Sequence, residues 1–166
     1  MWEWMPQLEF PERVYTSDEV RKAKELIDKG HKHDLTVEGS QSFKQKVEDA
    51  LQLVKTAGYY DFLRTYIRQI VEIDGLTQLR NADAMIWANK YTVDNPVDAA
   101  SIFIQKANIM KEYLELKHYY SGEAEKRAVE KRIEFLEMLR QKSTDKEIIV
   151  ECERLLRLWR EGSLVY

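Results

Sequence analysis

The few histidines of this chain limit the chemistry that it can do. The only ones are His31, His33 and His118, and no serine stands in a Gly-x-Ser-x-Gly context. The sequence also contains neither of the glycine-rich phosphate-binding motifs, Gly-x-x-x-x-Gly-Lys or Gly-x-Gly-x-x-Gly. These patterns disfavour Ser-His-Asp hydrolysis and nucleotide chemistry.

One short histidine motif is a candidate metal site. In an extended His31-Lys32-His33-Asp34 segment, two imidazoles would lie on one face, a spacing that can hold a divalent metal. The alternative is a polar turn that leads from a helix end at Gly30 into a strand. A lone His-x-His is a weak signal, and the turn is the favoured interpretation.

The single cysteine, Cys152, excludes an intramolecular disulfide and a cysteine-based zinc site. It lies on the apolar stripe of an expected final helix, where a thiol behaves as a small hydrophobe. We therefore expect it to be buried rather than to act as a nucleophile.

A carboxylate on an apolar stripe is more informative. Glu125 lines up at helical spacing with Ala128, Val129, Ile133 and Leu136, so it points toward the helix before it. Buried there, it would need a cation, a metal or hydrogen-bond donors. Alternatively, its place in the first helical turn leaves it half exposed beside the helix dipole.

The element that must position these groups is a central helix from Asn95 to His118. It opens with the helix-start signal Asn95-Pro96-Val97-Asp98. Its apolar residues cover nearly the whole circumference, which is typical of a helix packed on several sides: Ile102, Phe103, Ile104, Ala107, Ile109, Met110, Tyr113 and Leu114.

The rest of the chain predicts an α+β fold that is predominantly helical. We expect about six helices and a small sheet of two to four strands before the central helix. Residues 1–166 are read as a single domain, with residues 1–16 as an extended N-terminal arm packed on it. The other helices are expected from Ser17 to Gly30, from Ser42 to Gly58, over 59–70, over 122–141 and over 145–160, with strand character at 34–38, 71–75, 84–87 and 90–93.

The composition limits the classes of partner that the chain is expected to bind. The net charge is −3, with both signs interspersed, so nothing suggests nucleic acid. No apolar run is long enough for a membrane span, and the first residues lack the blocks of a signal peptide. We expect a cytoplasmic protein without a cofactor.

The order of elements resembles that of small zincin-like metallopeptidases of the gluzincin type. In that family a sheet leads into a helix carrying His-Glu-x-x-His, and a following helix supplies a glutamate as third zinc ligand. The corresponding window here is Gln105-Lys106-Ala107-Asn108-Ile109, with Glu125 following it. The resemblance covers about residues 35–139 and rests on element order and on the residues around this window.

The departures from the family motif decide the expected chemistry. Gln105 and Ile109 stand where the two imidazoles belong, and Lys106 stands where the general base belongs. The resemblance therefore implies a scaffold, natural or engineered, that has lost its metal site. Lys106 and Glu125 could form a charge pair that replaces the charge of the metal.

Such a helix can instead present a binding surface. Gln105, Ile109, Tyr113 and Leu116 fall near one line, where an enzyme of this kind would have its cleft, and Ile102 and Met110 adjoin it. With Lys106, these residues make up the candidate binding surface. The simpler interpretation is that these residues are core beneath the N-terminal arm.

Three functions follow from the sequence. The first is a non-catalytic zincin-like domain that binds another protein. The second is a metal-dependent hydrolase using His31, His33, His118 and Glu125, and the third is a structural domain that forms a homodimer.

Overall fold

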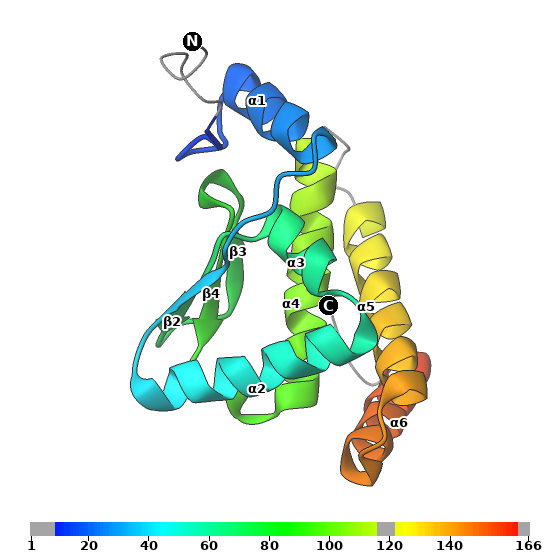
Figure 1. Ribbon diagram of the computed structural model, residues 1–166. Helices are drawn as coiled ribbons and strands as arrows, with labels where there is room; N and C mark the ends of the chain where they lie inside the picture. The colour runs from blue at the N-terminus through cyan, green and yellow to red at the C-terminus, as the bar shows by residue number, and fades with distance from the viewer. Residues whose placement is uncertain (1–8, 116–121, 163–166) are drawn as a thin grey trace.

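The computed structural model describes residues 9–115 and 122–162, and it confirms an α+β fold that is predominantly helical (Figure 1). Residues 1–8, 116–121 and 163–166 lie outside the described residues. Two candidate residues of the sequence analysis, Leu116 and His118, are among them. The helices are α1 (Ser17–Asp28), α2 (Gln41–Ala57), α3 (Tyr60–Tyr66), α4 (Pro96–Leu114), α5 (Gly122–Lys142) and α6 (Lys146–Arg160), and the strands are β1 (Thr36–Glu38), β2 (Gln69–Ile73), β3 (Gln78–Arg80) and β4 (Met85–Asn89).

The helix starts follow from side-chain caps. Thr16 and Glu19 form a reciprocal capping box at the start of α1, and Ser40 caps α2 by accepting from the amide of Phe43. Asn95 accepts from two amides at the start of α4, as its sequence predicts, and Asp145 does the same for α6. Each cap satisfies amides that would otherwise lack a partner in the first turn.

The sheet has the strand order β1-β2-β4-β3, in which the first three strands are parallel and β3 runs antiparallel to β4. In the register of the sheet, Ile70 of β2 lies beside Ile86 of β4, and both side chains are fully buried. In Figure 1, helices α3, α4 and α5 stand on one side of the sheet, with α4 between the sheet and α5. The core therefore lies between the sheet and the helices.

Helix α4 is the central element, as predicted. It contacts α5 most extensively and also packs against α1, α2, α3, α6 and β3. Phe103, Ile104, Ala107 and Met110 are fully buried on it. This burial on several sides explains why its sequence is apolar around most of its circumference.

Three details of the predicted secondary structure are wrong. Helix α3 ends at Tyr66 rather than near Ile70, because Gln69 already pairs with Met85 in the sheet. Residues 90–93 are not a strand: the segment turns, with the Tyr91 amide bonded to the Asn89 side chain, and continues into the 3-10 helix η3 (Thr92–Asp94). Strand β3 was not predicted, because its single apolar residue, Leu79, gives no alternating pattern and its pairing with β4 defines it.

Candidate functional site

The face of α4 that meets α5 carries a row of buried polar side chains. Ser101, Gln105, Asn108 and Glu112 follow one another at spacings of four, three and four residues, so they lie on one side of the helix. Gln105 is only 5% exposed. Buried polar groups need partners, and α5 supplies them.

The partner at the centre of this row is Arg132 of α5, which is only 8% exposed. Its guanidinium donates from Nε to Ser101 Oγ at 2.9 Å and from Nη1 to Gln105 Oε1 at 2.8 Å. A third bond runs from Nη2 to Asp98 Oδ1 at 2.6 Å. The guanidinium carbon also lies 4.8 Å from the centre of the Trp159 ring, a cation–π contact with α6.

Burial lowers the pKa of Arg132, and the charge and hydrogen bond of Asp98 oppose that shift. The guanidinium stays charged, because arginine does not lose its proton in proteins. The space beside Gln105 is therefore occupied by a fixed cation of the chain itself.

A second charged contact lies further along the interface between α4 and α5. Arg127 of α5 donates from Nε and Nη2 to the carboxylate of Glu112, with Nη2–Oε1 at 2.6 Å. Asn108 donates to the same carboxylate at 3.3 Å. Neither this pair nor Arg132 was recognised in the sequence. The signal was available, since Arg132 lies on the same stripe as Glu125, Ala128 and Leu136.

The predicted binding surface divides into two parts. Ile102, Lys106, Ile109 and Tyr113 are half-buried and follow one another at spacings of four, three and four residues, so they form one row along α4. Gln105 and Met110 are buried and are not on this surface, because Gln105 faces Arg132 and Met110 belongs to the core. Leu116 lies outside the described residues.

Lys106 and Glu125, the predicted charge pair, influence each other electrostatically. Burial lowers the pKa of Lys106, while the charge of Glu125 opposes the shift and that of Arg132 adds to it. Among the ion pairs between described residues there is none that joins the two side chains, and the half-buried Glu125 stands in the first turn of α5. The charge pair stays a prediction.

The histidine motif lies between the turn at Gly30 and strand β1, as the favoured interpretation expects, and its rings form an aromatic cluster. The rings of His31 and His33 lie with their centres 4.9 Å apart, and both contact Phe10. Within residues 9–115 and 122–162 no group of three His, Cys, Asp or Glu side chains is placed to hold a metal ion. His118 lies outside those ranges, so the predicted hydrolase site with Glu125 stays a prediction.

Cys152 is buried, as predicted, and burial raises the pKa of its thiol to about 11. Nearby Glu151 contributes to the same shift. A buried, protonated thiol is a poor nucleophile, so Cys152 acts as part of the core.

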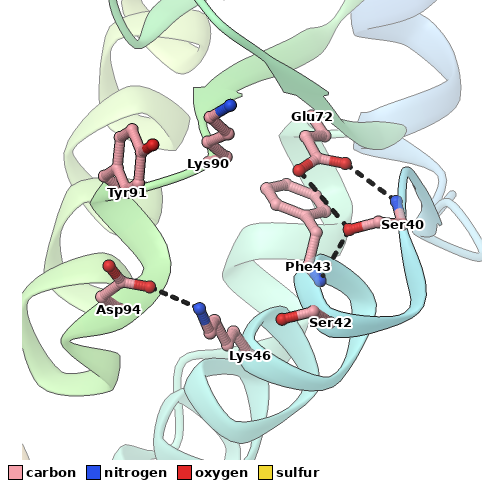
Figure 2. A pocket seen from close by; sticks show the side chains of 8 residues that line it. All are labelled: Ser40, Ser42, Phe43, Lys46, Glu72, Lys90, Tyr91 and Asp94. Carbon is pink, nitrogen blue, oxygen red and sulfur yellow. Dashed lines mark hydrogen bonds and ion pairs between the residues drawn. The ribbon is translucent and has the colours of Figure 1, made fainter.

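A polar pocket lies at the carboxyl ends of the parallel strands, where ligands bind in many α/β sheets (Figure 2). It has a volume of about 280 Å³ and is lined by residues from α2, from the end of β2 and from the segment after β4. Its charges are already paired: Lys46 with Asp94 at 2.5 Å, Lys90 with Asp74 at 3.0 Å, and Glu72 with the amide of Ser40 at 2.8 Å. We therefore assign it no ligand.

Comparison of the chain with models of protein families, with curated proteins and with solved structures finds no match. None of the helices described in the structure is long and apolar enough to cross a membrane. A functional interpretation therefore rests on the geometry of α4 and its neighbours.

Proposed function

We propose that this chain, natural or engineered, is a non-catalytic zincin-like domain that has no zinc site in its central helix and acts by binding another protein. The half-buried row Ile102, Lys106, Ile109 and Tyr113 on α4 is the proposed binding face. This row carries the proposal, because the other long faces of α4 are covered by α5 and by the core.

The order of the elements supports the zincin-like scaffold, and the residues of the motif window support the loss of its zinc chemistry. The sheet leads into α4 and α4 into α5, which is the order that the resemblance implies. In the motif window, however, Gln105 accepts a hydrogen bond from a buried cation, and Ile109 has no donor atom for a metal. An arginine beside the metal position would also repel a dication.

The side chains of this half-buried row favour a protein partner. Two isoleucines and a tyrosine supply apolar area, which contributes to binding when it is removed from water. Lys106 stands between the isoleucines with its pKa lowered by burial. A partner that brings a carboxylate to Lys106 would compensate for the lost hydration. The net charge of −3 argues against nucleic acid, and a cytoplasmic location belongs to the same proposal.

Site-specific photo-crosslinking tests this proposal in the cell that makes the protein. A photoreactive residue at Ile109 should give a discrete cross-linked protein. The same residue at Val150, which is 63% exposed on α6, is the matched control and should not give that product. Introducing Ile102→Arg alongside the photoreactive residue should abolish the product. Equal cross-linking from both positions would overturn the proposal.

The same experiment distinguishes a homodimer from a complex with a different protein. A product of twice the mass of the chain, together with concentration-dependent sedimentation of the purified protein, would assign the face to a second copy. A product containing a different protein, with the purified chain sedimenting as a monomer, would support the heterologous partner.

A further inference from the structure

One face of the sheet lies away from the helices that cover the core. Ile70 and Ile86 are fully buried and belong to the core between the sheet and the helices. Side chains alternate between the two faces of a strand, so the neighbouring Val71, Met85 and Trp87 point to the other face, which we call the open face. Figure 1 shows α3, α4 and α5 together on one side of the sheet, which is the core side.

The open face carries a group of apolar side chains. Val71, Ile73, Met85 and Trp87 are half-buried on it, and among the described residues none of the four packs against the core. Strands β1, β2 and β4 are parallel, and parallel sheets are almost always covered on both faces. An apolar face of this kind therefore indicates that a further segment packs on it.

The first described residues of the chain are fixed beside this sheet. Arg68, directly before β2, donates from Nη2 to the carbonyl of Glu12 at 2.7 Å. The amide of Val14 donates to the carbonyl of Ala82, between β3 and β4, at 2.6 Å. Residues 9–14 are thus held at the amino ends of β2 and β4, so the segment before them starts from the strand ends that border the open face.

The sequence of residues 1–8, which lie outside the described residues, suits this face. Trp2, Trp4 and Leu8 occupy even positions, so an extended chain would present them on one side. Pro6 has no amide to donate to a strand ladder, which disfavours an added edge strand and favours packing on a face. The length also suffices, because eight extended residues reach about 26 Å, whereas four neighbouring strands extend across about 14 Å.

Arg80 gives a chemical reason why tryptophan suits the open face. Its guanidinium carbon lies 4.2 Å from the centre of the Trp87 ring, and Arg80 itself is exposed on the edge strand β3. A planar guanidinium stacks on aromatic rings, and the side of it that is turned away from Trp87 can accept another indole. The same indole would remove part of the apolar face from water.

We propose that residues 2–8 pack in extended form across the open face of the sheet. Their two tryptophans contact Trp87 and the guanidinium of Arg80. The segment supplies the second cover that a parallel sheet ordinarily has, and the contact removes apolar area from water on both of its sides. This inference does not rest on the proposed protein-binding face of α4, because it concerns a different surface.

Photo-crosslinking within the full chain tests the proposal. Gln78 lies beside Trp87 in the register of the sheet and shares the open face with it. A photoreactive residue at position 78 should therefore join to residues 1–8 of the same chain, and peptide mapping by mass spectrometry identifies that product. The same photoreactive residue at Val150, which is 63% exposed on α6, is the control and should not give it.

Substitutions in the segment show whether its alternating pattern matters. Trp2→Ser together with Trp4→Ser should abolish the product from position 78. Met5→Ser is the matched variant, because an extended chain turns residue 5 to the opposite side, and it should retain the product. Circular dichroism checks that each variant is folded.

Several results would overturn the proposal. They are absence of the product from position 78, equal yields from the double variant and Met5→Ser, and cross-linking of residues 1–8 to a photoreactive residue at Ile109 of α4 instead. A product of twice the mass of the chain would assign the open face to a second copy and would overturn the proposal as well.

Discussion

Gln105 of α4 and Arg132 of α5 are joined by a hydrogen bond of 2.8 Å from Nη1 of the guanidinium to Oε1 of the amide. Both side chains are buried, and Ser101 and Asp98 accept the remaining bonds of the same guanidinium. The central helix thus places an amide where the resemblance to metallopeptidases expects an imidazole. The positive charge beside that amide belongs to the chain, which removes the need for an ion there.

We predict that Arg132→Ala lowers the free energy of unfolding by about 3–5 kcal/mol, because Asp98 and Gln105 lose the buried cation that satisfies them. Urea unfolding followed by circular dichroism measures the loss. Arg157→Ala, on an exposed position of α6, is the control and should change stability by less than about 0.5 kcal/mol.

The same contact can be tested by replacing both partners. The double change Gln105→Met with Arg132→Met should recover much of the stability that Arg132→Ala loses, since apolar side chains of similar size often substitute for a buried polar pair. If Arg132→Ala lowered the free energy of unfolding no more than Arg157→Ala does, the guanidinium would be solvated and the interface between α4 and α5 would not depend on it.

We predict that Lys106→Met leaves the protein at least as stable as the parent at pH 7. Burial is the main cause that lowers the pKa of Lys106, so the folded state disfavours its charge. Since the unfolded state holds the proton more tightly, the penalty is largest at neutral pH and fades as pH rises toward 10.5, the ordinary pKa of the group. Urea unfolding at pH 7 and pH 9.5 measures the difference between variant and parent, which should shrink at the higher pH.

The opposite result would identify a buried charge pair. If Lys106→Met cost about 3–5 kcal/mol, Glu125 would have lost an essential partner. Glu125→Gln is the companion variant: a true pair would make this change costly as well, whereas a half-exposed Glu125 tolerates it.

The sequence predicted the helices well because their signals are local. Caps such as Asn95 and the apolar spacing of α6 act within a few residues, and both appear where expected. Strand β3 could not be predicted, because pairing with β4 rather than its own three residues defines it. Lys90-Tyr91-Thr92-Val93 has strand-like residues, but the Asn89 side chain captures the amide of Tyr91 and turns the chain.

The candidate site was only partly predictable for a related reason. Spacing along α4 predicted one surface that included Ile102, Lys106 and Ile109, which are half-buried in the structure. The spacing could not separate these residues from Gln105, because consecutive residues of a helix are rotated by only about 100° from one another. Only the packing of the partner helix shows which face is covered. The guanidinium of Arg132, which comes from 27 residues further along the chain, makes that distinction.

We predict a loss of stability in mild acid that depends on His33. Burial lowers the pKa of folded His33 to about 4, from an ordinary value of 6.5. The unfolded chain therefore takes up a proton as pH falls below 6.5, whereas the folded protein does not until about pH 4, so stability declines across that window and then levels off. The contribution should be on the order of 2 kcal/mol.

Urea unfolding at intervals between pH 7 and pH 4 measures this effect. Carboxylates titrate in the same range, so the informative quantity is the difference between the parent and His33→Leu. The variant should show a flatter dependence on pH, and parallel curves would mean that His33 is charged in the folded protein.

We predict that Gly39→Ala destabilises the junction between β1 and α2 by about 2–3 kcal/mol. A Cβ at this position would lie 2.7 Å from Glu72 Cβ and 2.9 Å from Phe43 Cδ2, and the backbone has a φ of +154°. Relief of the clash must move the strand end of β2 or the buried Phe43, and either movement weakens the bond from the Ser40 amide to Glu72. Gly122→Ala is the control, because nothing lies within 4 Å of its Cβ position and the change should be nearly neutral. Equal urea midpoints for the two variants would show that the β1–α2 junction adjusts freely and that the close approach of Gly39 to Glu72 does not constrain the fold.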